Sequence, residues 1–300
     1  MGGGPAMQID RLIRSVRDRG NPTVLGLDTS LDYIPEDFAR PFLKKSPGEA
    51  VFAFNAALLE ALGDIIACVK IQIAYYEAMG TDGMECLSRT ITAARGLDYV
   101  VIVDAKRGDI GATASAYSAA YMRESSPFRA DFMTVNPYFG TDGMEPFIAD
   151  CEASGTGLFV LVKTSNPSGG EFQDVVTEDG RRLYELVGRR VSEWGAKLIG
   201  GEGYSSVGAV VGATYPEQGK SLRIRMPHTY FLLPGYGAQG ATAGGLASCF
   251  DERGEGAVVA ASRSIICAHK KTGETDFVQA ARAEAIRMRD ELRSVLGEKR

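Results

Sequence analysis

With 300 residues the chain is long enough for one large α/β domain, and its 45% hydrophobic and 24% charged residues argue against a disordered or fibrous protein. The net charge of −5 and the lack of a long basic block exclude extended contact with nucleic acid or an anionic membrane surface. No hydrophobic run reaches the roughly 20 residues that cross a bilayer. We therefore predict a single domain, 1–300, that acts on a small molecule, with residues 1–6 as a disordered tail or an expression artefact.

Eight short hydrophobic or β-branched runs recur along the chain. They lie at residues 23–28, 65–71, 99–104, 132–136, 157–163, 207–213, 230–234 and 256–262. Each run is nearly continuous and does not alternate with polar residues, which is typical of parallel strands buried on both faces.

The segments between these runs are predicted to be mainly helical. Clear cases are 47–62, with Val51, Phe54, Leu58 and Leu62 at helical spacing, and 275–296 near the end of the chain. The longest connection, 165–206, is predicted to be an insertion with its own helix at 176–194. Eight strand and helix repeats favour a closed parallel barrel, a (β/α)8 TIM barrel with an insertion in the middle of the chain.

Polar side chains end five of the predicted strands. They are Asp28, Lys70, Asp104 with Lys106, Asn136 and Lys163. Active sites in this fold are built from the carboxyl ends of the strands and the loops that follow them. Any one of these residues could simply cap a strand in solvent, but the set favours a site at the barrel mouth.

Asp104 and Lys106 are two residues apart at the end of the third strand, so strand alternation turns both side chains to one face. Opposite charges in a buried site stabilise each other, and a further carboxylate at Asp109 would favour a charged Lys106. Lys70 could extend this into an alternating network that holds a proton donor beside a substrate carboxylate. A salt-bridge belt that only closes the rim of the barrel is an equally good interpretation.

Asp109 directly precedes the helix-forming run that starts at Ile110, so its simplest role is that of a helix N-cap. Thr113 lies four residues later, one helical turn away, and could face the same way. Capping alone does not explain the position of Asp109 five residues after a candidate catalytic aspartate.

A glycine-rich turn follows the seventh strand, and Arg263 follows the eighth. The turn runs from Pro234 to Gly240 and includes Gly237 and Gln239. Loops at these two positions form the recurrent phosphate site of the fold, where backbone N–H groups and a helix N-terminus attract the anion and an arginine contacts two of its oxygens. We predict a phosphate site here, against the alternative of ordinary tight turns.

The five cysteines are scattered and contain no CxxC pair, so neither a disulfide framework nor a zinc site is indicated and a cytoplasmic location is expected. Only two histidines, His228 and His269, are present, far apart in the sequence. A metal site built on them is therefore not expected.

The string from Val103 to Gly111, VDAKRGDIG, resembles the DxKxxD signature of orotidine 5′-monophosphate decarboxylases, and PGYGAQG at 234–240 resembles their phosphate loop. The similarity extends from LGLD at 25–28 to ASRS at 261–264. The strings NPY at 136–138 and TSNP at 164–167, with the long insertion, are most similar to the longer bacterial subgroup (type 2) of that family.

This resemblance implies roles for particular residues. Lys70, Asp104, Lys106 and Asp109 would form a charged tetrad with Lys106 as the proton donor. Substrate contacts would come from Asp28 to the ribose, Ser165 to the pyrimidine, and Gln239 with Arg263 and the glycines Gly237 and Gly240 to the phosphate. Asp109 and Thr113 would reach into the active site of a neighbouring subunit, which makes a homodimer the expected assembly.

The implied reaction converts orotidine 5′-monophosphate into uridine 5′-monophosphate and carbon dioxide in de novo pyrimidine biosynthesis, without a cofactor. The main alternative is a magnesium-dependent sugar-phosphate decarboxylase or aldolase of the same superfamily, some of which share the DxKxxD motif. Lys70 and the loop containing Gln239 favour the nucleotide. A third alternative, a catalytically inactive nucleotide-binding barrel, is disfavoured by the complete tetrad.

Overall fold

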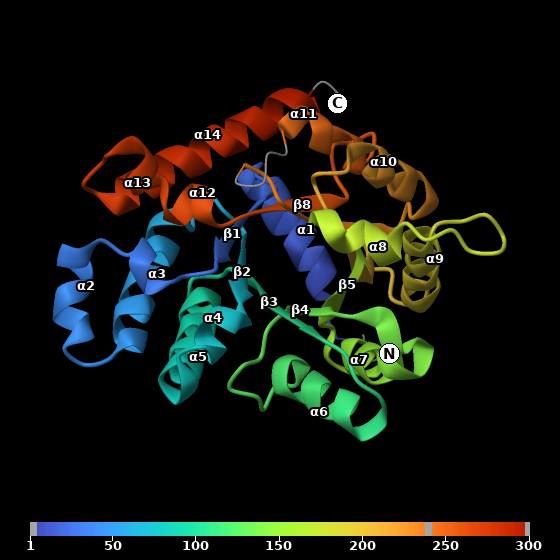
Figure 1. Cartoon of the computed structure of the whole chain (residues 1–300), viewed down its shortest axis with the longest axis horizontal. Helices are drawn as coiled ribbons and strands as arrows, with labels where there is room; N and C mark the ends of the chain where they lie inside the picture. Colours follow the sequence, from blue (N-terminus) through green and yellow to red (C-terminus); the bar gives the residue numbers. More distant parts are fainter. Residues whose placement is uncertain (1–4, 238–241, 298–300) are drawn as a thin grey trace.

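The computed structural model describes residues 5–237 and 242–297, and its strands form one closed barrel in chain order. Each strand runs parallel to its neighbours, and the last strand pairs with the first. Helices surround this barrel as a ring (Figure 1). The prediction of a (β/α)8 barrel is therefore confirmed.

The strands agree with the eight predicted hydrophobic runs. They are β1 (Thr23–Leu27), β2 (Cys68–Gln72), β3 (Val100–Arg107), β4 (Phe132–Val135), β5 (Gly157–Lys163), β6 (Ser205–Val211), β7 (Thr229–Pro234) and β8 (Ala257–Ala261). The largest differences are of three residues: β3 ends at Arg107 and not at 104, and β2 begins at Cys68 and not at 65. The backbone amides of Ile65 and Ile66 both donate to the carbonyl of Leu62, so the end of the preceding helix uses these residues.

Helices and short 3-10 turns connect the strands. The helices are α1 (Gln8–Arg19), α2 (Glu36–Leu43), α3 (Pro47–Leu62), α4 (Ile73–Glu77), α5 (Gly80–Gly96), α6 (Gly111–Met122), α7 (Thr141–Ser154), α8 (Gly170–Gln173), α9 (Leu183–Gly195), α10 (Pro216–Arg225), α11 (Ala243–Leu246), α12 (Arg263–Ile266), α13 (Ala268–Thr272) and α14 (Phe277–Gly297). The 3-10 turns are η1 (Leu31–Tyr33), η2 (Pro137–Phe139), η3 (Pro167–Gly169) and η4 (Ala247–Cys249).

Helix α3 has the bounds predicted from its hydrophobic spacing, and two local features fix its start. The Ser46 side chain accepts a hydrogen bond from the Glu49 amide at 3.2 Å, and Pro47 occupies the first turn, where a missing N–H costs nothing. Helix α14 begins two residues after the predicted start at 275 and ends one residue after the predicted end at 296.

The helix predicted at 176–194 is shorter than expected, because α9 begins only at Leu183. Val176 instead forms an isolated antiparallel bridge with Arg182. The turn between them contains Asp179 and Gly180, and Gly180 has a φ of +81°. Asp-Gly turn chemistry therefore overrides the apparent helical periodicity of this segment.

Two hydrophobic layers hold the barrel together. The outer layer lies between the strands and the surrounding helices, and the inner layer fills the barrel with alternate strand residues such as Val24, Val100 and Phe132. Helix α1 adds Ile9 and Leu12 to the inner layer. Because α1 leads directly into β1, it covers the amino ends of the strands and leaves the carboxyl ends open.

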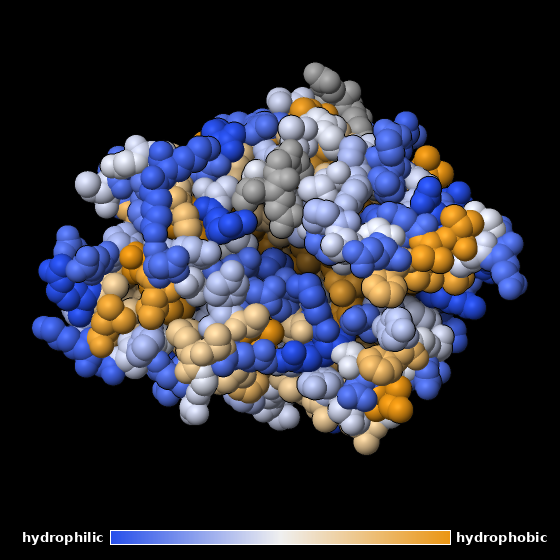
Figure 2. Space-filling model, in the orientation of Figure 1, coloured by the Kyte–Doolittle hydropathy of each residue, from blue (hydrophilic) through white to orange (hydrophobic). Residues whose placement is uncertain are grey.

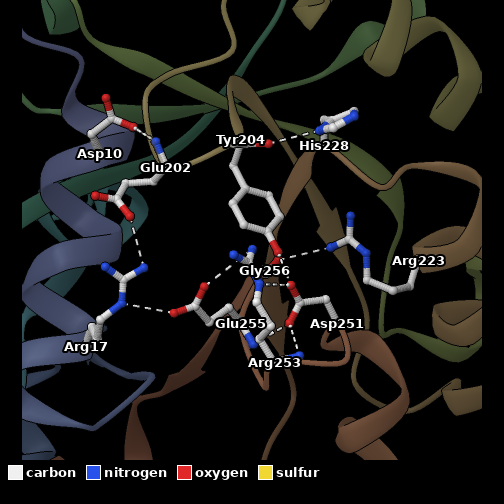
Figure 3. A network of polar contacts seen from close by, with 11 residues as sticks. Asp10, Arg17, Glu202, Tyr204, Arg223, His228, Asp251, Arg253, Glu255 and Gly256 are labelled. Carbon is white, nitrogen blue, oxygen red and sulfur yellow. Dashed lines mark hydrogen bonds and ion pairs between the residues drawn. The ribbon is translucent and has the colours of Figure 1, made fainter. Parts of the chain in front are cut away.

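A network of polar contacts ties this closed end together (Figure 3). Arg17 on α1 lies 2.9 Å from Glu202 and 3.0 Å from Glu255, and the Tyr204 hydroxyl donates to Asp251 at 2.8 Å. A cavity of about 470 Å³ adjoins the network. The charged groups here satisfy one another and join α1 to the segments before β6 and β8, which is a stabilising role typical of this end of the fold.

The two N-terminal residues that the structure describes, Pro5 and Ala6, lie close to the loop before β5. A Cβ atom added to Gly155 would come within 2.5 Å of the Ala6 carbonyl oxygen. The other residues for which a tail was predicted, 1–4, lie outside the described part of the chain.

Candidate active site

A cleft of about 410 Å³ opens at the carboxyl ends of the strands. The first four strands and the residues that follow them contribute Asp28, Lys70, Gln72, Asp104, Lys106 and Thr134 to its lining. Figure 2 shows this end of the molecule, with hydrophilic side chains gathered at the centre of the face. Three of the five predicted polar strand ends, Asp28, Lys70 and Asp104 with Lys106, therefore meet at the mouth of the barrel.

Asp104 is the centre of an alternating chain of charges. One of its oxygens, Oδ2, lies 3.0 Å from Lys70 Nζ, and the other, Oδ1, lies 2.6 Å from Lys106 Nζ. Lys70 Nζ also lies 3.1 Å from Asp28 Oδ1. The order along the cleft is thus carboxylate, ammonium, carboxylate, ammonium, and the prediction that Lys70 joins Asp104 and Lys106 is confirmed.

Strand register explains why Lys70 and Asp104 meet. In β2, Cys68 faces the inner layer, so Lys70 and Gln72 share its face two and four residues later. Ile102 does the same in β3 and places Asp104 on the inward face. Gln72 pairs with Asp104 in this register, so Gln72 and Asp104 lie at one level of the barrel and Lys70 lies two residues before Gln72 on the same face.

Asp104 and Lys70, the two buried charges of this row, stabilise each other's charged forms. Burial would raise the pKa of the Asp104 carboxyl, but Lys70 and then Lys106 outweigh it and hold this pKa well below its usual range. Burial would likewise lower the pKa of the Lys70 ammonium, but Asp104 and then Asp28 raise it above its usual range. Both groups are therefore charged at neutral pH.

Lys106 has an unusual backbone. Its φ is +48°, in the left-handed region that non-glycine residues rarely occupy, and the register of β3 against β4 shifts between Val103 and Arg107. The Lys106 amide donates to Thr134 Oγ1 at 2.9 Å. Its side chain is 44% exposed, whereas that of Lys70 is 6% exposed, so Lys106 is the ammonium that a bound ligand can reach.

Two neutral side chains, which the sequence analysis missed, complete the surroundings of Asp104. Gln72 Nε2 donates to Oδ2 at 3.0 Å, and Thr134 Oγ1 donates to Oδ1 at 2.8 Å. Each carboxylate oxygen thus has one ammonium partner and one neutral donor. Both residues could have been found from the sequence. Each is a polar residue in a hydrophobic strand, two positions from another residue that faces inward.

Asp109 and Thr113 do not join this cluster within one chain. Neither lines the cleft, and Thr113 is exposed on α6. The N-cap prediction for Asp109 is wrong: Ile110 occupies the cap position of α6, and Asp109 Oδ1 accepts from the Ile110 amide at 2.8 Å. The carboxylate therefore satisfies the backbone just before the helix begins.

Thr164, Ser165 and Asn166 form one wall of the cleft, and we call this segment the cleft wall. The Ser165 carbonyl accepts a hydrogen bond from the Thr214 hydroxyl at 3.2 Å. A Cβ atom at Gly212 would lie 2.8 Å from both the amide nitrogen and the Cα of Ser165, so only glycine allows the β6 loop to approach the wall this closely.

A second wall of the cleft carries the predicted anion site. Pro234, Gly235, Tyr236, Ser262 and Arg263 line it. Arg263 is exposed and opens α12, and Gly237 has a φ of +72°, a conformation that favours glycine. The predicted contacts of Gln239 and Gly240 fall on residues outside the described part of the chain.

Two of the polar strand ends serve structure. Asn136 caps η2 by accepting from the Tyr138 amide at 3.1 Å. Lys163 is 0% exposed and pairs with Asp174 of the insertion at 2.8 Å. Neither residue lines the cleft.

The histidines lie apart from the cleft. His228 Nδ1 lies 3.0 Å from the Gly203 carbonyl, and His269 is buried on α13. In residues 5–237 and 242–297, no cluster of three or more His, Cys, Asp or Glu side chains is arranged to hold a metal ion. None of the helices described is both long and apolar enough to cross a membrane.

Comparison with known proteins gives consistent matches. Residues 49–276 match the model of the family described as "Orotidine 5′-phosphate decarboxylase / HUMPS family". Orotidine 5′-phosphate decarboxylase of Clostridium acetobutylicum is 44% identical over 292 residues, which cover 97% of this chain and 100% of the relative. The enzyme of the same name from Rhodopirellula baltica is 41% identical over 287 residues, with 91% and 95% covered.

Solved structures give matches that are consistent with these sequence comparisons. A crystal structure described as a candidate orotidine 5′-phosphate decarboxylase from Streptomyces avermitilis superimposes with a TM-score of 0.84 at 33% identity, covering 99% of this chain and 98% of that one. The structure of Leishmania donovani OMP decarboxylase gives a TM-score of 0.75 at 26% identity, with 95% and 99% covered.

Proposed function

Since the chain belongs to the orotidine 5′-phosphate decarboxylase / HUMPS family, we propose that it converts orotidine 5′-monophosphate into uridine 5′-monophosphate and carbon dioxide, a step of de novo pyrimidine biosynthesis. The observation that carries the proposal is Asp104, a charged carboxylate held between Lys70 and Lys106 on the wall of a cleft of nucleotide size. A site of this kind places negative charge and a proton donor side by side.

Lys106 is the proton donor in this proposal. The bond between C6 of the pyrimidine and its carboxylate breaks, carbon dioxide leaves, and the electron pair stays on C6. The Lys106 ammonium, the more exposed of the two, stabilises that pair and transfers a proton to it, and solvent then reprotonates the amine. No electron acceptor is consumed.

Asp104 favours the transition state by its position. Its charge lies beside the place that the substrate carboxylate would occupy and repels it, and this repulsion is relieved as carbon dioxide departs. Lys70, which is 6% exposed and bonded to both Asp28 and Asp104, keeps Asp104 charged and fixed. In this proposal Lys70 positions Asp104 and does not donate the proton.

The rest of the substrate would lie across the cleft. In this proposal Asp28 accepts from the ribose, Ser165 contacts the pyrimidine, and Arg263 with the turn at Gly237 binds the phosphate. Asp28, Ser165 and Arg263 all line the cleft. The predicted phosphate contacts of Gln239 and Gly240 are part of the same proposal. Binding energy from the phosphate, remote from C6, would then help to hold the base against Lys106.

A homodimer is part of the proposal, since Asp109 and Thr113 lie outside their own cleft. Beside Asp109, three large hydrophobic side chains are exposed: Ile110 at 54%, Tyr138 at 86% and Phe139 at 49%. A surface of this kind is typical of a protein interface. A second copy seated there would cover these side chains and bring Asp109 toward the partner's active site.

The family description also includes HUMPS proteins, so the family model alone does not separate the nucleotide substrate from the magnesium-dependent alternative. The relatives compared above favour the nucleotide substrate, because they carry the name orotidine 5′-phosphate decarboxylase at 41–44% identity. The cleft itself presents two ammonium groups to Asp104, an arrangement that competes with a divalent cation for that carboxylate. The alternative is therefore not favoured.

The test is the loss of orotidylate absorbance on incubation with purified protein, with and without a metal chelator. We expect equal rates in both conditions. The proposal would be refuted if the chelator abolished activity and added magnesium restored it. It would also be refuted if the protein turned over a keto-sugar phosphate but not the nucleotide.

A further inference from the structure

Lys163 is a charged side chain buried where β5 ends. The residue is 0% exposed, and its Nζ lies 2.8 Å from Asp174 Oδ1, 4.7 Å from the Tyr215 ring centre and 5.5 Å from the Tyr184 ring centre. Strand alternation would turn it inward with Leu161, but the register of β5 against β6 shifts between these two residues. The ammonium therefore points to the inserted segment and away from the cleft.

Asp174 comes from that insertion, directly after α8, and its own backbone is fixed. The Asp174 carbonyl accepts from Arg182 Nη1 at 3.1 Å, and its amide donates to the Gly170 carbonyl at 3.2 Å. The ion pair therefore joins the end of a barrel strand to the first turn of the insertion. Removing one charge would leave the other in a poorly solvated site, which makes such a pair a strong constraint on geometry.

The cleft wall lies between these two anchors. Gln173, adjacent to Asp174, accepts from the Thr164 amide at 3.0 Å and donates to the Thr164 hydroxyl at 2.7 Å. Thr164 in turn donates to Asn166 Oδ1 at 2.7 Å. On the other side, the Lys163 carbonyl accepts from the Gly212 amide at 2.7 Å, so the wall is held from both ends.

We propose that the Lys163–Asp174 ion pair is a positioning device that holds the cleft wall against the base of the bound nucleotide. The proposal rests on the proposed function, and it assigns a role to the insertion at 165–206. Neither partner lines the cleft, so both act through Gln173 and the wall. The predicted phosphate site is carried by other segments, Arg263 and the turn after β7.

The test compares two ligands that differ only at the base end. Uridine 5′-monophosphate and ribose 5-phosphate are measured as competitive inhibitors of wild type and of Asp174→Asn, together with kcat/KM for decarboxylation. We expect Asp174→Asn to lower kcat/KM about 10- to 100-fold, because a displacement near 1 Å can have that effect. Inhibition by uridine 5′-monophosphate should weaken about 10-fold, while inhibition by ribose 5-phosphate should not change.

Asp179→Asn is the matched control, because it removes an exposed carboxylate paired with Arg181 in the same insertion. Asp174→Glu should restore most of the activity, since the pair can re-form at the partly exposed Asp174 position. Gln173→Leu removes the two Thr164 contacts and leaves the ion pair intact, and it should give the same ligand selectivity if Asp174→Asn does not fold.

The outcomes separate the two proposals. If wild type does not decarboxylate the nucleotide, the proposed function fails. If wild type is active but Asp174→Asn and Gln173→Leu behave like Asp179→Asn, or weaken both ligands equally, the positioning role is refuted.

Discussion

Lys106 reaches Asp104 across only two residues, with 2.6 Å between Nζ and Oδ1, and does so from a left-handed backbone with a φ of +48°. A regular strand would place the two side chains parallel on one face. The positive φ and the register shift in β3 turn Lys106 back over the carboxylate. The backbone strain is thus located at the residue proposed to deliver the proton.

We expect Lys106→Ala to lower kcat by about 100-fold or more, since a positioned proton donor typically contributes that much. Binding of uridine 5′-monophosphate should change only a few-fold, because ribose and phosphate contacts remain. The measurement is kcat from the absorbance assay together with product inhibition. Lys44→Ala, at an exposed lysine on the surface, is the control and should match wild type. Unchanged kcat in Lys106→Ala would refute the assigned role.

The shared-site dimer can be tested by mixing subunits. Lys106→Ala and Asp109→Ala should each be nearly inactive alone. Mixed one to one, half of the dimers would combine both variants, and each of these would contain one intact site, so about a quarter of wild-type activity should return. The measurement is activity after subunit exchange, with sedimentation to confirm dimers. Recovery of no activity in a sample that contains mixed dimers would place Asp109 in its own subunit's site.

Gly237→Ala tests the turn of the proposed phosphate site. A Cβ atom there would lie 3.5 Å from Ser264 Cβ, an ordinary contact, so the effect should come from the φ of +72°. The left-handed conformation costs a residue with a side chain about 1–2 kcal/mol, and KM should rise accordingly. Gly244→Ala in α11 is the control, since a Cβ there meets nothing within 4 Å. Equal KM values for the two variants would contradict the prediction.

Much of the fold could be predicted because the strands are buried on both faces. Their hydrophobic runs are nearly continuous, and local signals such as Ser46 and Pro47 define α3 to the residue. That Lys70 and Asp104 both face the barrel mouth was also predictable from strand alternation, and the register of β2 against β3 then brings them into contact.

What could not be predicted depends on contacts between distant segments. Lys163 looked like another active-site residue because it ends a strand, but its partner Asp174 comes from a short turn that has no periodic signal. The helix of the insertion was misplaced for a related reason, since the turn at Gly180 interrupts a segment with helical spacing. The role of Gln72 required the register of β2 against β3.

His269 should make stability depend on pH. It is 9% exposed, packs against Phe277, and neither ring nitrogen has a hydrogen-bond partner among the described residues. Burial and then Lys270 hold its pKa below the ordinary value of 6.5. The unfolded chain therefore binds the proton first, and the free energy of unfolding should fall as pH drops below that value. His269→Leu should remove this component in urea unfolding at several pH values, whereas His228→Leu, at an exposed site, should retain it. Identical pH profiles for wild type and His269→Leu would contradict the argument.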